Sequence, residues 1–183
     1  MSFFTGTTKL SNTSTIPSGD KITKDAAVTL LHDHDFFLSC DPHYVSHRAL
    51  PGDADDAGRP ASEVYQLPAG LEAVGSPAVR LYEVVDHVPN PVWSSSVVSR
   101  EKFVDLREGL WVRIRSPLAI VMETQWTIRE ADDGALELVE DVEISCSKLL
   151  LGIVRGQVDA NWKGIHAKIV ARLVGDARGK AEE

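Results

Sequence analysis

The sequence has few cysteines, few basic residues and no long apolar run. Its two cysteines, Cys40 and Cys146, cannot build a disulfide framework and lack the spacing of a zinc knuckle. Nineteen Lys and Arg against 27 Asp and Glu give a net charge of −8 without a basic cluster, which argues against nucleic acid as the main partner. Apolar runs such as 118–122 are far shorter than the roughly 18 residues that a membrane span needs.

Several sequence motifs of enzymes and targeting signals are missing as well. There is no Gly-x-Ser-x-Gly elbow, glycine-rich phosphate loop or dinucleotide fingerprint, so we expect no cofactor. The first residues lack the basic start and apolar run of a signal peptide, and we expect a cytoplasmic protein. The length of 183 residues with 43% apolar residues predicts one globular domain over 1–183, with 176–183 as a disordered tail.

The first half of the chain predicts a strand, two short helices and a second strand. Residues 7–16 are rich in β-formers and precede a Pro-Ser-Gly break. Thr23 can cap a helix, and two short helices or one broken helix occupy about 24–40. A possible strand at 44–50 leads into 51–77, which is rich in Gly, Pro and Asp and is predicted as a long loop or lid.

In the second half of the chain, apolar residues first recur at every second position, which predicts strands. Near the C-terminus they recur at every third or fourth position, which predicts a helix. The strand-like runs are 79–88, 92–106, 110–115, 118–129 and 136–145. Their short connections make neighbouring strands antiparallel. An apolar stripe over about 148–174 then predicts one long helix. An α+β fold follows, in which a curved antiparallel sheet of about six to seven strands wraps around the C-terminal helix.

Four segments of the sequence carry a resemblance to a known family: Leu30–Phe36, Tyr82–Pro89, Thr124–Thr127 and Cys146–Leu150. They resemble the helix-grip fold of the START and polyketide-cyclase-like (SRPBCC) superfamily, and more narrowly a mostly fungal, largely uncharacterised group within it. The resemblance covers nearly the whole chain but carries no shared set of catalytic residues. It implies a hydrophobic cavity between sheet and helix, which different members use for lipid transfer, hormone sensing or cyclisation of natural products.

Glu140 is the first candidate for catalytic chemistry. Counting by two along 136–145 places it on a face that is otherwise made of Leu, Val and Ile. A carboxyl group in an apolar cavity has a raised pKa, which suits general acid or base catalysis near neutral pH. Alternatively, Glu140 pairs with an arginine, or a bulge at 139–141 turns it towards solvent.

His87 is the second catalytic candidate, because it precedes the Pro89-Asn90-Pro91 turn at the expected cavity mouth. A histidine there can move protons near neutral pH, or it is only a rim residue. A further set of residues is predicted to bind the ligand, and for Trp126 plain core packing is the alternative. These residues are Trp126, Thr124, Tyr82, His34, Met122, Val158 and Trp162.

Two other groups of polar residues receive a structural interpretation. The run from His32 to Asp35 superficially resembles the HD pair of metal-dependent phosphohydrolases, but no second acid-rich helical cluster accompanies it, so we predict no metal site. Arg113 and Arg115 alternate with apolar residues and are predicted on the outer surface of the sheet, beside acidic side chains.

These observations leave two hypotheses about function. One is a cofactor-independent cyclase, isomerase or dehydratase acting on a polyketide or terpenoid-like substrate, with Glu140 and His87 as catalytic groups. The other is a non-catalytic protein that binds or transfers a lipid or another hydrophobic metabolite, with 51–77 as a gate. A scaffolding protein with a filled core is a third possibility. The expected partner is a hydrophobic small molecule, and the expected state is a monomer or homodimer.

Overall fold

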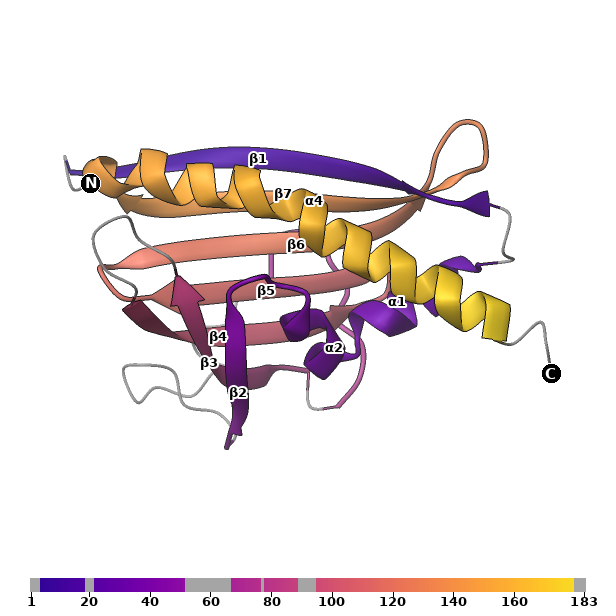
Figure 1. Cartoon of the computed structure of the whole chain (residues 1–183), viewed down its shortest axis with the longest axis horizontal. Coiled ribbons are helices and arrows are strands. Elements are labelled where there is room, and N and C mark those ends of the chain that lie inside the picture. The colour runs from indigo at the N-terminus through magenta and orange to yellow at the C-terminus, as the bar shows by residue number, and fades with distance from the viewer. Residues whose placement is uncertain (1–3, 19–21, 52–66, 77, 89–94, 180–183) are drawn as a thin grey trace.

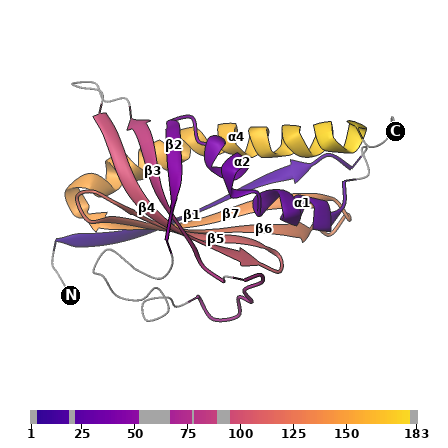
Figure 2. The ribbon, with the colours of Figure 1, turned by 90° about the horizontal axis from the view of Figure 1, so that it is seen from below.

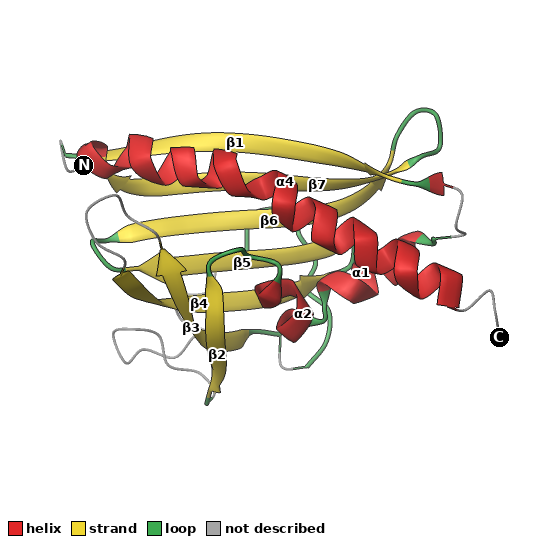
Figure 3. Ribbon diagram, in the orientation of Figure 1, coloured by secondary structure: helices red, strands yellow, loops and turns green. Residues whose placement is uncertain are grey.

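A computed structural model describes residues 4–18, 22–51, 67–76, 78–88 and 95–179. They form one antiparallel sheet of seven strands in the order β1-β7-β6-β5-β4-β3-β2, with one long and two short helices (Figures 1 and 3). The elements are β1 (Thr5–Ile16), α1 (Lys24–Leu31), α2 (His34–Ser39), β2 (Tyr44–Leu50), β3 (Arg80–Val88), β4 (Ser95–Leu106), β5 (Gly109–Ser116), β6 (Ile120–Glu130), β7 (Leu136–Ser147) and α4 (Lys148–Gly179). The predicted α+β helix-grip architecture is confirmed.

Side-chain caps explain why the first helical region divides into α1 and α2. The Thr23 hydroxyl accepts a hydrogen bond from the Ala26 backbone N–H at 3.2 Å and starts α1. The Asp33 carboxylate accepts from the Phe36 N–H at 3.1 Å and starts α2. Of the two predicted possibilities, two short helices are therefore found, with the end of α1 followed at Asp33 by a new N-cap. No group of three or more metal-ligating side chains occurs in the described part of the chain.

All three helices lie on one side of the curved sheet (Figure 2). In the C-terminal half of α4, His166, Ile169 and Leu173 are buried, whereas the N-terminal half is only partly covered and packs near β1 and β7. The helix continues to Gly179, so 176–179 belong to α4, and 180–183 lie outside the described residues. The sheet and α4 thus pack tightly at one end, and the other end has room for a cavity.

The opposite side of the sheet is covered by the described part of the predicted lid. Trp111 is buried there against Val104 and Leu106, together with Leu67, Leu71, Ala73 and Val79 from the segment that precedes β3. Burying the large Trp111 side chain needs such a cover. Residues 67–76 therefore pack on the face away from α4. The rest of the predicted loop, 52–66 and 77, lies outside the described residues, and a lid role for 51–77 stays a prediction.

Two backbone features determine how β5 and β6 begin. Leu118 and Ala119 both have positive φ angles, of 63° and 56°, so the chain turns there and β6 starts at Ile120 instead of Leu118. At the other end of this hairpin, a Cβ atom on Gly109 would lie 1.9 Å from the carbonyl oxygen of Trp126. Only glycine permits this close approach of the two strands.

Candidate functional site

A cavity of about 290 Å³ lies between the inner face of the sheet and α4. Its volume is at the lower end of the range for small-molecule sites, and most of its lining is apolar. The lining residues are Phe37, Leu38, Asp41, His43, Val84, Asp86, Val88, Val97, Glu101, Val112, Ile114, Ser116, Ile120, Met122, Thr124, Trp126, Glu140, Val142, Val154, Gln157, Val158, Asn161, Trp162 and Ile165.

Glu140 is buried in this lining, with 4% of its surface exposed. It lies opposite Asn12 in β1, whose side-chain Nδ2 donates to Glu140 Oε2 at 3.0 Å. The Nε2 atom of His166, from α4, is 3.7 Å from the same oxygen and has no hydrogen-bond partner, and His166 is 1% exposed. The other ring nitrogen of His166 shares a hydrogen bond of 2.8 Å with the Ser14 hydroxyl. A carboxyl group and an imidazole thus meet at the cavity without an intervening arginine.

The aromatic wall beside Glu140 comes from β6 and α4. Trp126 lies directly opposite Glu140 in the neighbouring strand and donates from Nε1 to the Thr124 hydroxyl at 3.1 Å. The centroids of the Trp126 and His166 rings are 5.3 Å apart, and those of the Trp162 and His166 rings are 5.2 Å apart. The polar atom of Trp126 is therefore satisfied internally, and its ring is free to contact an apolar ligand. Met122 and Val158 line the same cavity, as do Thr124 and Trp162.

A second polar region of the cavity contains Glu101, Asp86, Asp41 and His43. Glu101 is 6% exposed, and its Oε1 accepts from the Ser99 hydroxyl at 2.9 Å. Burial raises the pKa of Glu101 to about 8; the Ser99 hydrogen bond opposes the shift, and the nearby Asp86 and Asp41 carboxyl groups add to it. Burial and the Asp41 charge also raise the pKa of Asp86 to about 6, against the effect of His43. At pH 7 Glu101 therefore keeps its proton and can donate a hydrogen bond.

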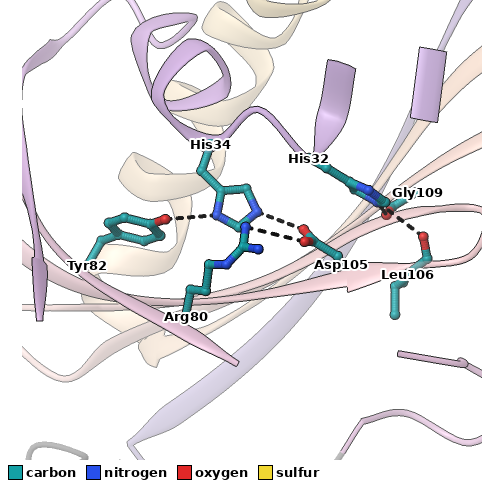
Figure 4. A network of polar contacts seen from close by, with 7 residues as sticks. All are labelled: His32, His34, Arg80, Tyr82, Asp105, Leu106 and Gly109. Atoms are coloured by element: carbon teal, nitrogen blue, oxygen red, sulfur yellow. Dashed lines mark hydrogen bonds and ion pairs between the residues drawn. The ribbon is translucent and has the colours of Figure 1, made fainter. Parts of the chain in front are cut away.

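His34 and Tyr82 lie in a separate polar network that Figure 4 shows from close by. His34 Nε2 is 2.8 Å from Asp105 Oδ1, and His34 Nδ1 is 3.0 Å from the Tyr82 hydroxyl. Arg80 approaches the other Asp105 oxygen at 3.4 Å. These contacts connect α2 to β3 and β4. Neither His34 nor Tyr82 is among the residues that line the cavity.

His32 and His87 also lie away from the cavity. His32 Nε2 is 2.8 Å from the Gly109 carbonyl oxygen and 3.2 Å from that of Leu106, so it caps the turn between β4 and β5 (Figure 4). His87 is exposed on β3, because residues of this strand alternate and the inner face carries Val84, Asp86 and Val88. The structure therefore does not bring His87 to Glu140.

Comparison with known protein families gives a match that covers almost the whole chain. Residues 5–175 match the family described as Domain of unknown function (DUF7053). The chain belongs to this family. No curated protein matches the sequence of this DUF7053 chain.

Solved structures show a similar fold at low sequence identity. The di-domain ARO/CYC StfQ from the steffimycin biosynthetic pathway is 12% identical to the DUF7053 chain, with a TM-score of 0.61. The alignment covers 97% of the DUF7053 chain and 53% of StfQ. The chain therefore spans about half of that protein. The Zhui aromatase/cyclase from Streptomyces sp. R1128 is 12% identical with a TM-score of 0.50, covering 97% and 96%. Ara h 8.0201 is 13% identical with a TM-score of 0.52, covering 91% and 99%.

These similarities show that the DUF7053 chain shares the helix-grip fold of these proteins. Membership of a mostly fungal group stays a prediction. In the part of the chain that the structure describes, no helix is long and apolar enough to cross a membrane.

Several polar residues of the DUF7053 site were not predicted from the sequence, among them Asn12, Asp41, His43, Asp86, Glu101 and His166. The sequence carries a signal for His166 but none that decides the position of Glu101. His166 lies three and seven residues before Ile169 and Leu173, on the predicted apolar stripe. Glu101 alternates with Val97, Ser99 and Phe103, but the opposite face of β4 carries Val98, Val104 and Leu106, so periodicity does not identify the inner face.

Proposed function

We propose that the cavity binds a hydrophobic small molecule and that the protein acts on it as a cofactor-independent cyclase, isomerase or dehydratase of natural-product biosynthesis. The observation that carries the proposal is the position of Glu140, a buried carboxyl group that lines an apolar cavity beside His166 and Trp126. The fold shared with the Zhui aromatase/cyclase and StfQ supports it.

Glu140 takes the role of general base in this proposal. Its Oε2 is oriented by the Asn12 amide, and the adjacent His166 Nε2 can donate a hydrogen bond to the carboxylate or accept its proton. A substrate whose acidic C–H lies against Glu140 loses its proton there. The electron pair then forms a new double bond or expels a leaving group, which is the chemistry common to isomerisation, dehydration and aldol-type cyclisation. The surrounding apolar wall excludes water and holds the substrate in position.

A non-catalytic binding or transfer protein is the second candidate function. The specific observation in its favour is that, among the described residues, the polar contacts of Glu140 come from Asn12 and His166, and neither is a second acidic group at the same place. A carrier needs the apolar cavity but not the acid-base properties of Glu140.

The base role can be tested without the natural substrate by using 5-nitro-1,2-benzisoxazole, a small apolar molecule that eliminates when a base removes its ring C–H proton. The N–O bond breaks and its electron pair stays on the phenolate oxygen, whose absorbance is measured. We expect saturable turnover by the wild type and a loss of about 100-fold in kcat/KM for Glu140→Gln. Glutamine keeps an oxygen that can accept from Asn12, so the fold should be retained.

Glu143→Gln is the matched control, because Glu143 lies on the outer face of the same strand and pairs with Lys9 at the surface. It should react like the wild type. Equal rates for Glu140→Gln and wild type would overturn the base role. Binding of the compound by the wild type without turnover above the rate in buffer alone would favour the carrier.

A further inference from the structure

We propose that the hydrophobic molecule held in this cavity is a lipophilic amine, whose protonated nitrogen lies at the region formed by Glu101, Asp86 and Asp41. The inference rests on the proposed function, because it names the chemical class that the same cavity takes. It selects against fatty acids, phospholipids and other anionic amphiphiles.

The first argument is the charge of the cavity wall. Four carboxyl groups line the cavity, those of Asp41, Asp86, Glu101 and Glu140, while the described lining contains no lysine or arginine. His43 is the one lining residue of the described part that can become positively charged. A carboxylate or phosphate ligand would have no lysine or arginine of the described lining to pair with, and it would lie close to other carboxyl groups in a medium of low dielectric constant.

The second argument is the burial of Glu101 without an ion pair. Its carboxyl group is 6% exposed and accepts one neutral hydrogen bond, from Ser99. Within the described residues, no ion pair reaches Glu101, Asp86 or Asp41, whereas Asp105 and Glu83 elsewhere on the sheet have arginine partners. Buried carboxyl groups normally have such a partner. An ammonium group from the ligand would supply it.

The third argument is the distance between the two polar regions. Along the sheet Glu101 lies opposite Ile114, Ile114 opposite Met122, and Met122 opposite Ile144, which is four residues from Glu140. Three strand spacings and four residues correspond to about 14 Å across the strands and about 13 Å along them for a flat sheet. The wall between the two regions is apolar. A nitrogen at Glu101 therefore leaves the hydrocarbon part of the ligand to extend towards Trp126 and Glu140.

The experiment compares three probes with the same ten-carbon chain, decylamine, decanol and decanoate, by isothermal titration calorimetry near pH 7. We expect decylamine to bind at least about tenfold more tightly than decanol, and decanoate to bind most weakly. In the double variant Glu101→Gln, Asp86→Asn this preference should fall to about twofold while decanol binding is retained. Glu143→Gln on the outer face should keep the preference.

Proton release provides a second measurement that a structural effect would not reproduce. A bound ammonium group favours the ionised form of Glu101, so decylamine binding should release protons from the protein. The release is measured by repeating the titration in buffers of different ionisation enthalpy, because the observed binding enthalpy then differs between the buffers. Decanol should release none, and Glu101→Gln should reduce the release. Val158→Trp, which fills the cavity from α4, should abolish binding of both probes, whereas Ala160→Trp on the exposed side should not.

The outcomes separate this inference from the proposed function. Decanol binding with no preference for the amine would overturn the amine inference and leave the cavity as a hydrophobic site. Decylamine binding that survives Val158→Trp would show adsorption to the acidic surface and would also overturn it. Absence of binding by all three probes would overturn both proposals.

Discussion

Glu101 links the chemistry of the cavity to the stability of the protein. Its pKa is raised from an ordinary value of 4.5 to about 8, so between these pH values the folded protein holds a proton that the unfolded chain releases. The contribution of this group to stability is complete below about pH 4.5 and is lost as the pH rises through 8. Asp86, with a pKa of about 6, acts in the same direction at lower pH.

We therefore predict that Glu101→Gln flattens the pH dependence of folding stability. The free energy of unfolding of the wild type, measured with urea, should decrease between about pH 5 and pH 8, and that of Glu101→Gln should decrease much less. Glu143→Gln, on the outer face, should follow the wild type. Parallel curves for the wild type and Glu101→Gln would contradict the assigned environment of Glu101.

For single residues, the sequence predicts which face of the sheet a side chain lies on where one face of the strand is clearly apolar. It fails where both faces of the strand carry apolar residues. Alternation along β6 and β7 correctly places Trp126, Thr124 and Glu140 on the inner face, because their strands have one clearly apolar side. His87 shares a face with apolar Leu81 and Val85, and this face turns out to be the outer one. Which apolar face is inside depends on what covers each side of the sheet, and that is a property of the tertiary structure.

Among the elements, α2 is held to the sheet by the network around His34. The ring of His34 is buried between Asp105 of β4 and Tyr82 of β3 (Figure 4). It also packs against the Phe103 ring, with the two ring centroids 4.6 Å apart. The hydrogen bond from His34 contributes to keeping the pKa of Asp105 below its ordinary value, against the effect of burial. The end of α2 in turn provides Phe37 and Leu38 to the cavity wall.

Removing the imidazole should loosen this attachment. We predict that His34→Ala lowers the free energy of unfolding by about 2 to 4 kcal/mol, because it leaves a cavity and removes partners from two buried groups. Tyr82→Phe should cost only about 1 kcal/mol, for one hydrogen bond. His87→Ala is the control, and as an exposed residue it should change stability by less than about 0.5 kcal/mol. A cost for His34→Ala no larger than that of His87→Ala would contradict the structural role of the network.

The elements themselves follow closely from local sequence. Caps at Thr23 and Asp33, the alternation of strands and the stripe of α4 all act between near neighbours, so they are readable in the chain. The path of 67–76 was not predicted, because its apolar residues Leu67, Leu71 and Ala73 pair with Trp111, about 40 positions away. Contacts of this separation leave no periodic signal.

For the whole molecule, the architecture gives α4 two roles. Its C-terminal half closes the core through Ile169 and Leu173, and its N-terminal half covers a space with Val154 and Val158. The carboxyl groups on the wall of this space give it an acidic character within a chain of net charge −8. The fold was predictable from the order of the elements, but the cavity and its acidic region required the side-chain arrangement.

The most direct test of this account is the fluorescence titration of the protein with the neutral probe N-phenyl-1-naphthylamine. The wild type should bind one equivalent with a blue-shifted, enhanced emission, because the probe leaves water for the apolar cavity. Val158→Trp, with its helix content verified by circular dichroism, should lose this binding, and Ala160→Trp should keep it. Equal probe binding by the two variants, or no saturable binding by the wild type, would contradict the claim that the cavity between the sheet and α4 is a ligand site.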